Sequence, residues 1–246
     1  MEKSCQNSFK KGFFDGLPIG LGYLSVSFAF GIKAVQQGFP ASMAVLMSMT
    51  NLTSAGQFAG LDLIIAGGSF IEMALTQFVI NLRYARMSIS LSQKLSEKVT
   101  LPQRMLIAFG NTDEVFAVAV SNKEKVGKKY MYGLILLPYI GWTLGTLMGA
   151  VAGNVLPESL ITALGIAIYG MFIAIVVPPM KKSKAVATVV AIAIALNCAF
   201  KYLPYLNQVS SGFVIIICAV TAAAIGAKLQ PINDIEDAAK EEEYAD

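Results

Sequence analysis

Residues 49–62 read Met49-Thr-Asn-Leu-Thr-Ser-Ala-Gly-Gln-Phe-Ala-Gly-Leu-Asp62, a polar segment within a chain otherwise apolar enough for a lipid bilayer. The segment contains the polar side chains of Asn51, Ser54 and Gln57, and Gly56 and Gly60 loosen its backbone. The hydrocarbon of a bilayer offers no hydrogen bonds to these side chains or to a loosened backbone. Polar, broken backbone at membrane depth persists only where protein or a water-filled cavity covers it, and transporters place substrate sites at such breaks. The stretch therefore indicates a small membrane transporter.

Composition places the chain among integral membrane proteins. Hydrophobic residues make up 55% of 246 positions and charged residues 14%, whereas soluble domains carry about 25% charged residues. The apolar residues fall in windows of about 20, the length that a helix needs to cross a bilayer, and the short alternating segments of a β-barrel do not occur. We predict an all-α, polytopic membrane helix bundle. Its single transport domain spans residues 17–228, between a cytoplasmic segment, 1–16, and an acidic cytoplasmic tail, 229–246.

The distribution of basic residues predicts the topology. Basic clusters near residues 10–11, 94–104, 123–129 and 181–184 mark cytoplasmic loops. All four face one side only if segments 41–67 and 105–120 dip into the membrane and return. This predicts six full spans, two broken or re-entrant segments, an arrangement compatible with an inverted repeat, and both termini in the cytoplasm. Eight ordinary crossings, with one basic loop outside, remain the alternative. The full spans are expected at 17–35, 69–91, 130–152, 159–177, 185–203 and 212–228.

A stripe of glycines follows one face of the span expected at 130–152. Gly141, Gly145, Gly149 and Gly153 recur every four residues. Small residues at this spacing let helices approach closely. The stripe predicts either packing within the chain or a face for a partner subunit.

Two adjacent acids lie in the middle of the second polar segment. Asp113 and Glu114 are flanked by apolar residues, and ionisable groups at membrane depth are functional candidates. A carboxylate held away from water takes up a proton more readily, so both are candidates for proton coupling. Adjacent carboxylates point in different directions from a helix, so we expect only one to line the path. Asn111-Thr112-Asp113 also reads as the N-terminal cap of a short helix, and the two interpretations are compatible.

Three further side chains complete the polar set. Arg83 can snorkel to the headgroups, pair with Asp113 or Glu114, or bind a substrate carboxylate. Asn81 lies deeper and needs a buried partner. Tyr23 supplies a ring and a hydroxyl from a glycine-rich first span, whose glycines serve either packing or close approach of a ligand.

Five motifs, in order, resemble the AzlC-type branched-chain amino acid exporters, and the resemblance covers roughly residues 8–228. The motifs are Gly16-Leu-Pro-Ile-Gly-Leu-Gly22-Tyr23, Ala29-Phe-Gly31, Ala55-Gly-Gln57-Phe58-Ala59, Asn81-Leu-Arg83 and Thr112-Asp-Glu114. The resemblance implies the large subunit of a two-component azaleucine-resistance permease in a bacterial inner or plasma membrane. It implies export of leucine, isoleucine and valine, with a small hydrophobic AzlD-type membrane partner. Thr53-Ser-Ala-Gly56 is more polar than is usual in the family, and Tyr84 replaces a common histidine.

These observations predict a function and a site. The chain has no nucleotide-binding P-loop and no histidine, so transport is expected to be secondary and any proton to be carried by carboxylates. We predict a proton-coupled secondary transporter of aliphatic amino acids that is not an enzyme, with no cofactor, metal or nucleic-acid partner. Its rival is a channel or a non-transporting assembly subunit. The expected substrate-binding residues are Tyr23, Asn51, Ser54, Gly56, Gln57 and Asn81, with Asp113 and Glu114 for proton coupling and Arg83 for charge pairing.

Overall fold

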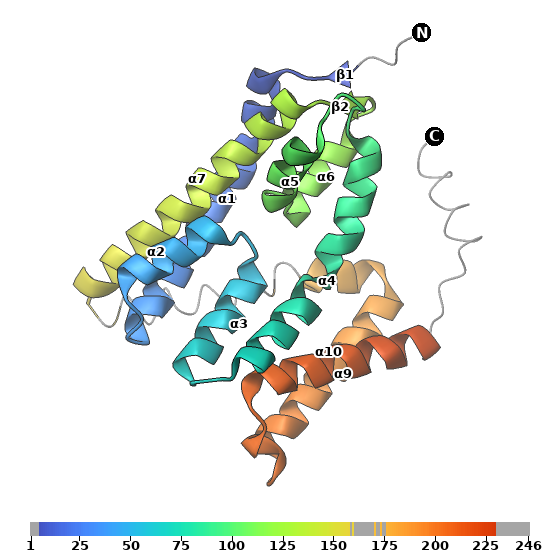
Figure 1. Ribbon diagram of the computed structural model, residues 1–246. Helices are drawn as coiled ribbons and strands as arrows, with labels where there is room; N and C mark the ends of the chain where they lie inside the picture. Colours follow the sequence, from blue (N-terminus) through green and yellow to red (C-terminus); the bar gives the residue numbers. More distant parts are fainter. Residues whose placement is uncertain (1–4, 158, 160–169, 171–172, 174–175, 230–246) are drawn as a thin grey trace. The chain divides into compact units, whose positions relative to one another are not determined.

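The computed structural model describes residues 5–157, 159, 170, 173 and 176–229 (Figure 1). The chain divides into two units, Met1–Met171 and Phe172–Asp246. In order, the first contains β1 (Cys5–Gln6), α1 (Phe9–Gln36), α2 (Ala41–Thr50), α3 (Ser54–Ile65), α4 (Phe70–Lys94), α5 (Leu101–Phe109), α6 (Asp113–Ser121), β2 (Lys125–Val126) and α7 (Lys128–Val155). The second contains α9 (Lys184–Tyr202), the 3-10 turn η1 (Leu206–Gln208) and α10 (Ser211–Leu229). The predicted all-α bundle is confirmed; the predicted domain limits stay a prediction.

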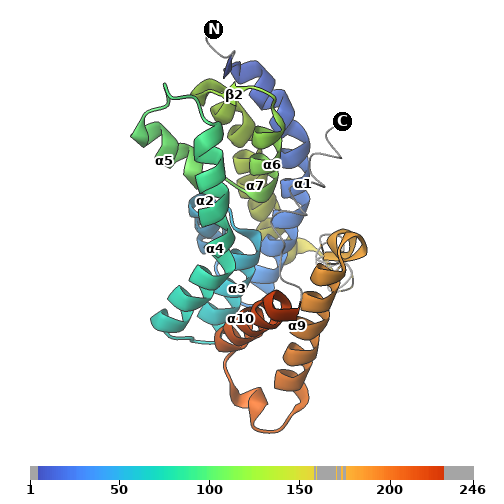
Figure 2. The ribbon, with the colours of Figure 1, turned by 90° about the vertical axis from the view of Figure 1, so that its right-hand side faces the viewer.

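Helices α1 and α7 lie side by side and run in the same direction (Figures 1 and 2). Glycines on both helices bring the backbones into contact. A Cβ added at Gly12 would lie 2.9 Å from the backbone nitrogen of Leu134, and one at Gly149 would lie 2.9 Å from the Cα of Phe28. The predicted stripe faces α1 along its length, so it is an intramolecular packing face. It comprises Gly141, Gly145, Gly149 and Gly153.

Helices α2 and α3 form the first of two hairpins. The hairpin enters from the end where α1 stops, and its tip lies at residues 51–53 (Figure 1). Gly38 and Gly67 adopt φ values of +79° and +67° in the turns that precede and follow it, a conformation that costs glycine little. At the tip, Asn51 Oδ1 accepts a hydrogen bond of 2.8 Å from the Thr53 amide. The Thr53 hydroxyl in turn caps α3.

The break in the first polar segment is confirmed, but its position differs from the expected one. The helix stops at Asn51 and restarts at Ser54, whereas Gly56 and Gly60 lie inside the regular α3. Their missing side chains make room for Gln77 of α4, whose amide would lie 2.6 Å and 3.3 Å from a Cβ at those two positions. The glycines thus serve packing, and local hydrogen bonds from Asn51 and Thr53 break the helix.

Helices α5 and α6 form the second hairpin, which enters from the opposite end of the unit (Figure 1). Its tip is Gly110, Asn111 and Thr112. Thr112 caps α6 by accepting from the Val115 amide at 3.4 Å, as predicted. Two hairpins entering from opposite ends are what an inverted repeat would produce, and that repeat stays a prediction.

Three of the four basic clusters meet at one end of the first unit. Strand β1 pairs in parallel with β2, and the Ser96 amide donates to Val126 at 2.9 Å. Lys125 lies 2.9 Å from Glu97, and its hydrogen bond lowers the pKa of the Glu97 carboxyl. The arrangement agrees with the prediction that the basic clusters at residues 10–11, 94–104 and 123–129 face the same side of the membrane. The fourth cluster belongs to the second unit.

Four helices in the described part of the chain are long and apolar enough to cross a membrane. They are α1, α7, α9 and α10. Helix α4 has 25 residues, about 37 Å at 1.5 Å per residue, but its polar side chains keep it out of this set. The span expected at 159–177 lies largely outside the described residues, so the total of six stays a prediction.

In the second unit, α9 and α10 pack together, and a Cβ at Gly226 would lie 3.7 Å from the Cβ of Val189.

Substitution of Gly149 by alanine tests the contact between α1 and α7. The added methyl group would meet the Phe28 backbone. Overpacking of this kind costs about 1–3 kcal/mol, or roughly 2–10 °C in the melting temperature of the detergent-purified protein. Gly22→Ala is the matched control, because nothing lies within 4 Å of its added Cβ and alanine favours the helix. Equal losses in both variants would contradict the packing role.

Candidate functional site

The tips of the two hairpins line one cavity of about 210 Å³ in the first unit. Both tips contribute polar groups, and α4 supplies the wall between them. None of the lining residues carries a carboxylate, ammonium or guanidinium group. The lining comprises Thr50, Asn51, Leu52, Thr53, Asn81, Tyr84, Ala108, Phe109, Asn111 and Thr112. The cavity lining is therefore uncharged and combines polar groups with a larger apolar surface.

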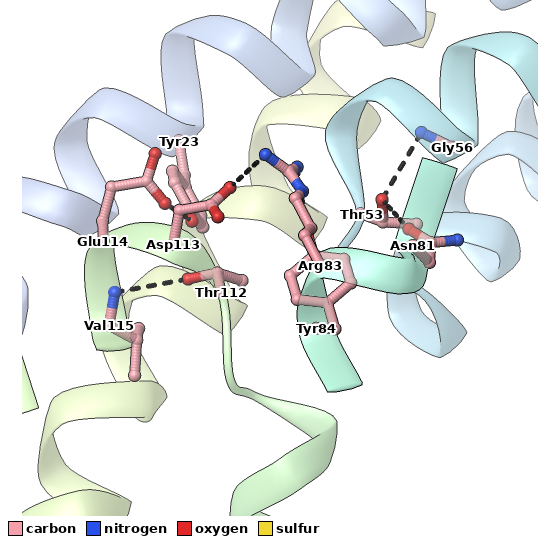
Figure 3. A network of polar contacts seen from close by, with 10 residues as sticks. All are labelled: Tyr23, Thr53, Gly56, Asn81, Arg83, Tyr84, Thr112, Asp113, Glu114 and Val115. Carbon is pink, nitrogen blue, oxygen red and sulfur yellow. Dashed lines mark hydrogen bonds and ion pairs between the residues drawn. The ribbon is translucent and has the colours of Figure 1, made fainter. Parts of the chain in front are cut away.

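A ladder of hydrogen bonds fixes the first tip to α4. Thr53 donates to Asn81 Oδ1 at 2.7 Å (Figure 3). Asn81 donates to Gln77 at 3.1 Å, and Gln77 donates to the carbonyl of Gly56 at 2.7 Å. This supplies the buried partner that the sequence requires for Asn81. The ladder leaves Asn81 at the cavity wall with its side chain held on two sides.

The two acids of α6 have different partners, as Figure 3 shows. Asp113 forms an ion pair of 2.7 Å with Arg83 of α4. Glu114 accepts a hydrogen bond from the hydroxyl of Tyr23 on α1. Of the alternatives for Arg83, pairing with Asp113 is the one observed. Each acid thus joins the second hairpin to a different long helix.

Gln57 lies in a separate, buried polar cluster. It is 1% exposed. Its amide donates to Ser48 at 2.5 Å and accepts from the indole N–H of Trp142 at 2.9 Å. Ser48 also contacts Thr146 of α7 at 2.7 Å. Gln57 therefore ties both arms of the first hairpin to α7.

The structure separates the predicted residues into three groups. Asn51 and Asn81 line the cavity. Tyr23, Arg83, Asp113 and Glu114 form the adjacent charged cluster. Ser54, Gly56 and Gln57 lie on α3 and do not line the cavity.

Sequence reasoning did not assign Asn111, Phe109 or Tyr84 to the site. The sequence indicates Asn111 only as part of a helix cap and Tyr84 only as a departure from the family pattern, and it gives no signal for Phe109. No group of three or more potential metal-ligating side chains occurs among the residues that the structure describes.

Two further cavities adjoin the site. One of about 260 Å³ lies between α4 and α5 and shares Ala108 with the central cavity. The other, of about 550 Å³, is lined by α4 and by Phe116 of α6, and Arg83 and Arg86 contribute to it. The first of these two cavities thus adjoins the central cavity, and the second shares Arg83 with the ion pair to Asp113.

Broken helices around a cavity, in a chain with four helices long and apolar enough to cross a membrane, are typical of membrane transport proteins. A model of the AzlC protein family matches residues 18–156, and the chain belongs to that family. The inner membrane protein YgaZ of Escherichia coli is 30% identical over 196 residues, covering 77% of this chain and 80% of YgaZ. An uncharacterized membrane protein of Archaeoglobus fulgidus is 34% identical over 190 residues, covering 76% and 83%.

A third relative is named for a substrate. The branched-chain amino acid transport protein AzlC of Bacillus subtilis is 23% identical over 150 residues, covering 60% of this chain and 58% of that protein. No solved structure matches. The family is one of transport proteins, which is consistent with the expectation that the chain is not an enzyme.

Substitution of Gln57 by alanine distinguishes a packing role from direct substrate binding. The change removes the partner of the Trp142 N–H and one partner of Ser48, and each buried polar group left unpaired costs about 1–3 kcal/mol. We expect a melting temperature several degrees lower in detergent, with Gln36→Ala, an exposed glutamine of α1, as the unaffected control. Unchanged stability together with lost leucine binding would instead support contact with substrate.

Proposed function

We propose that this protein is a secondary transporter that exports leucine, isoleucine and valine, binding them between the tips of its two hairpins. The observation that carries the proposal is the uncharged, amide-lined cavity on which both broken helices converge. The printed name of the Bacillus subtilis relative supports the substrate class. The family resemblance supports the outward direction and a small AzlD-type partner.

The lining suits a zwitterion with an aliphatic side chain. Such a ligand has no net charge, so amides, hydroxyls and helix ends satisfy it without a buried counter-charge. The side chain can lie against Leu52, Ala108 and Phe109. A cavity of roughly 150 Å³ accommodates benzene, so the observed volume suffices for an aliphatic amino acid. Because one methylene changes binding by only about 1–3 kcal/mol, overlapping use of the three amino acids is expected.

Proton coupling is proposed to reside in Glu114 rather than Asp113. Asp113 forms an ion pair of 2.7 Å with Arg83, so its protonation would leave the guanidinium without its partner. Glu114 has a neutral hydroxyl as its hydrogen-bond partner. Substitution of Glu114 by a neutral residue therefore leaves no opposite charge without a partner, whereas substitution of Asp113 does. Asp113 is then a structural link between α6 and α4.

Counterflow of labelled leucine in proteoliposomes tests the transport proposal. The wild-type protein should show saturable exchange, and Asn81→Ala should weaken the apparent affinity about tenfold or more, because hydrogen bonds to charged groups contribute about 1.5–3 kcal/mol. Asn154→Ala, at the far end of α7, is the matched control. Size-exclusion profiles establish that the variants are folded.

The same measurement separates the rival function. A channel would conduct leucine without counterflow, and an assembly subunit would move none. Either result, obtained with and without the small partner, would contradict the proposal.

Substitution of the two acids tests the coupling assignment. Glu114→Gln should retain leucine counterflow but lose accumulation driven by a proton gradient. Asp113→Asn should weaken both, because it leaves Arg83 without its partner. Glu97→Gln, a surface acid paired with Lys125, should change neither. Proton-driven transport that persists in Glu114→Gln would show that Glu114 does not carry the proton.

A further inference from the structure

Asn111 combines burial, a position at the cavity and an unused hydrogen-bond acceptor. The residue is 4% exposed and belongs to the cavity lining. Its amide nitrogen donates to Ser88 of α4 at 3.3 Å. Its Oδ1 is buried and has no partner among the described residues. Folded proteins pair nearly all buried polar atoms, so an unused acceptor beside a cavity indicates a ligand that donates.

Asn111 is distinguished from the other unpaired groups by its location. In the part of the chain that the structure describes, Thr76 Oγ1 and Thr143 Oγ1 are also buried without a partner. Neither threonine lines any of the three cavities. A hydroxyl can also rotate and act either as a hydrogen-bond donor or as an acceptor, whereas the carbonyl oxygen of an amide only accepts. The chemistry at Asn111 therefore requires a donor from the ligand.

The two helix ends at the cavity differ in charge. Helix α3 has no acid in its first turn, so its N-terminus presents the positive end of the helix dipole. Helix α6 carries Asp113 and Glu114 in its first turn. Arg83 compensates the charge of Asp113, and the charge of Glu114 opposes the dipole. The α3 end thus favours an anionic group and the α6 end a cationic one. Asn111 precedes α6 by two residues, on the side that favours the cation.

We propose that Asn111 Oδ1 accepts a hydrogen bond from the ammonium group of the transported amino acid, whose carboxylate faces the N-terminus of α3 near Thr53. The inference rests on the proposed function and adds the orientation of the substrate in the cavity. It assigns to Asn111 the discrimination between amino acids and the corresponding carboxylic acids, which lack the donor.

Competition binding tests this assignment. The full chain is purified in detergent and incubated with labelled leucine. The label is then displaced either with unlabelled leucine or with 4-methylpentanoate, the analogue of leucine that lacks the amino group. The wild-type protein should prefer leucine strongly. Asn111→Ala should weaken leucine binding about tenfold or more while leaving 4-methylpentanoate unchanged, so the preference collapses. Asn111→Asp, which keeps an acceptor at this position, should retain the preference.

Two controls separate ligand contact from structural effects. Ser88→Ala removes the partner of the Asn111 nitrogen but keeps its oxygen, and should preserve the preference for leucine. Asn154→Ala should behave as wild type, and melting temperatures verify folding. A folded Asn111→Ala protein with an unchanged preference would overturn the assignment while leaving the proposed function intact. A wild-type protein that binds no leucine would overturn both.

Discussion

The close contact between α1 and α7 is the constraint on which the rest of the first unit depends. In a bilayer, apolar surfaces gain little by leaving lipid, so helices associate through tight packing and polar contacts. Here a Cβ at Gly141 would lie 3.2 Å from the Cα of Gly20, so glycine faces glycine at the crossing. Two parallel backbones in contact over this length form one stiff element. Both hairpins attach to it.

Both members of the pair hold the hairpins, and α1 also pairs with the first of them through Lys33 and Asp62, 2.7 Å apart. Helix α7 holds the first hairpin through Trp142 and Thr146, and α1 holds the second through Tyr23. The rings of Tyr23 and Trp142 meet edge-on, with centroids 5.4 Å apart. Glu114 on one hairpin and Gln57 on the other are therefore joined through two aromatic side chains in contact. The contact of α1 with α7 keeps these rings together, and with them the relative position of the two tips.

The sequence predicted the elements of this arrangement better than their contacts. Polar residues in apolar windows reveal broken helices because lipid cannot satisfy them, and a four-residue glycine spacing reveals a helix face. The stripe alone did not identify α1 as its partner, since that contact joins residues about 120 positions apart.

The absence of long-range contacts from sequence patterns also explains why Gln57 was expected in the substrate site. Gln57 and Asn81 are both amides at membrane depth, and no local signal says that one meets a tryptophan 85 positions away while the other lines a cavity. The break was expected near the glycines because glycine loosens helices. Local hydrogen bonding by Asn51 and Thr53 determined it instead, and Gly56 and Gly60 accommodate a side chain of α4.

The placement of charge beside the cavity, rather than in its lining, has a physical consequence for transport. A buried carboxylate in direct contact with an ammonium group would bind it strongly and would slow its release. Hydrogen bonds from amides and hydroxyls to the charged ends of the substrate each contribute about 1.5–3 kcal/mol, less than the about 3–5 kcal/mol lost when a buried ion pair is broken. The substrate can therefore leave again, as transport pathways require. Asp113 and Glu114 follow directly after Thr112 of the cavity lining, so their charge influences the cavity without contributing to its wall. In the proposed function, separating recognition by amides from charge on the adjoining helix lets one hairpin tip serve both substrate and proton.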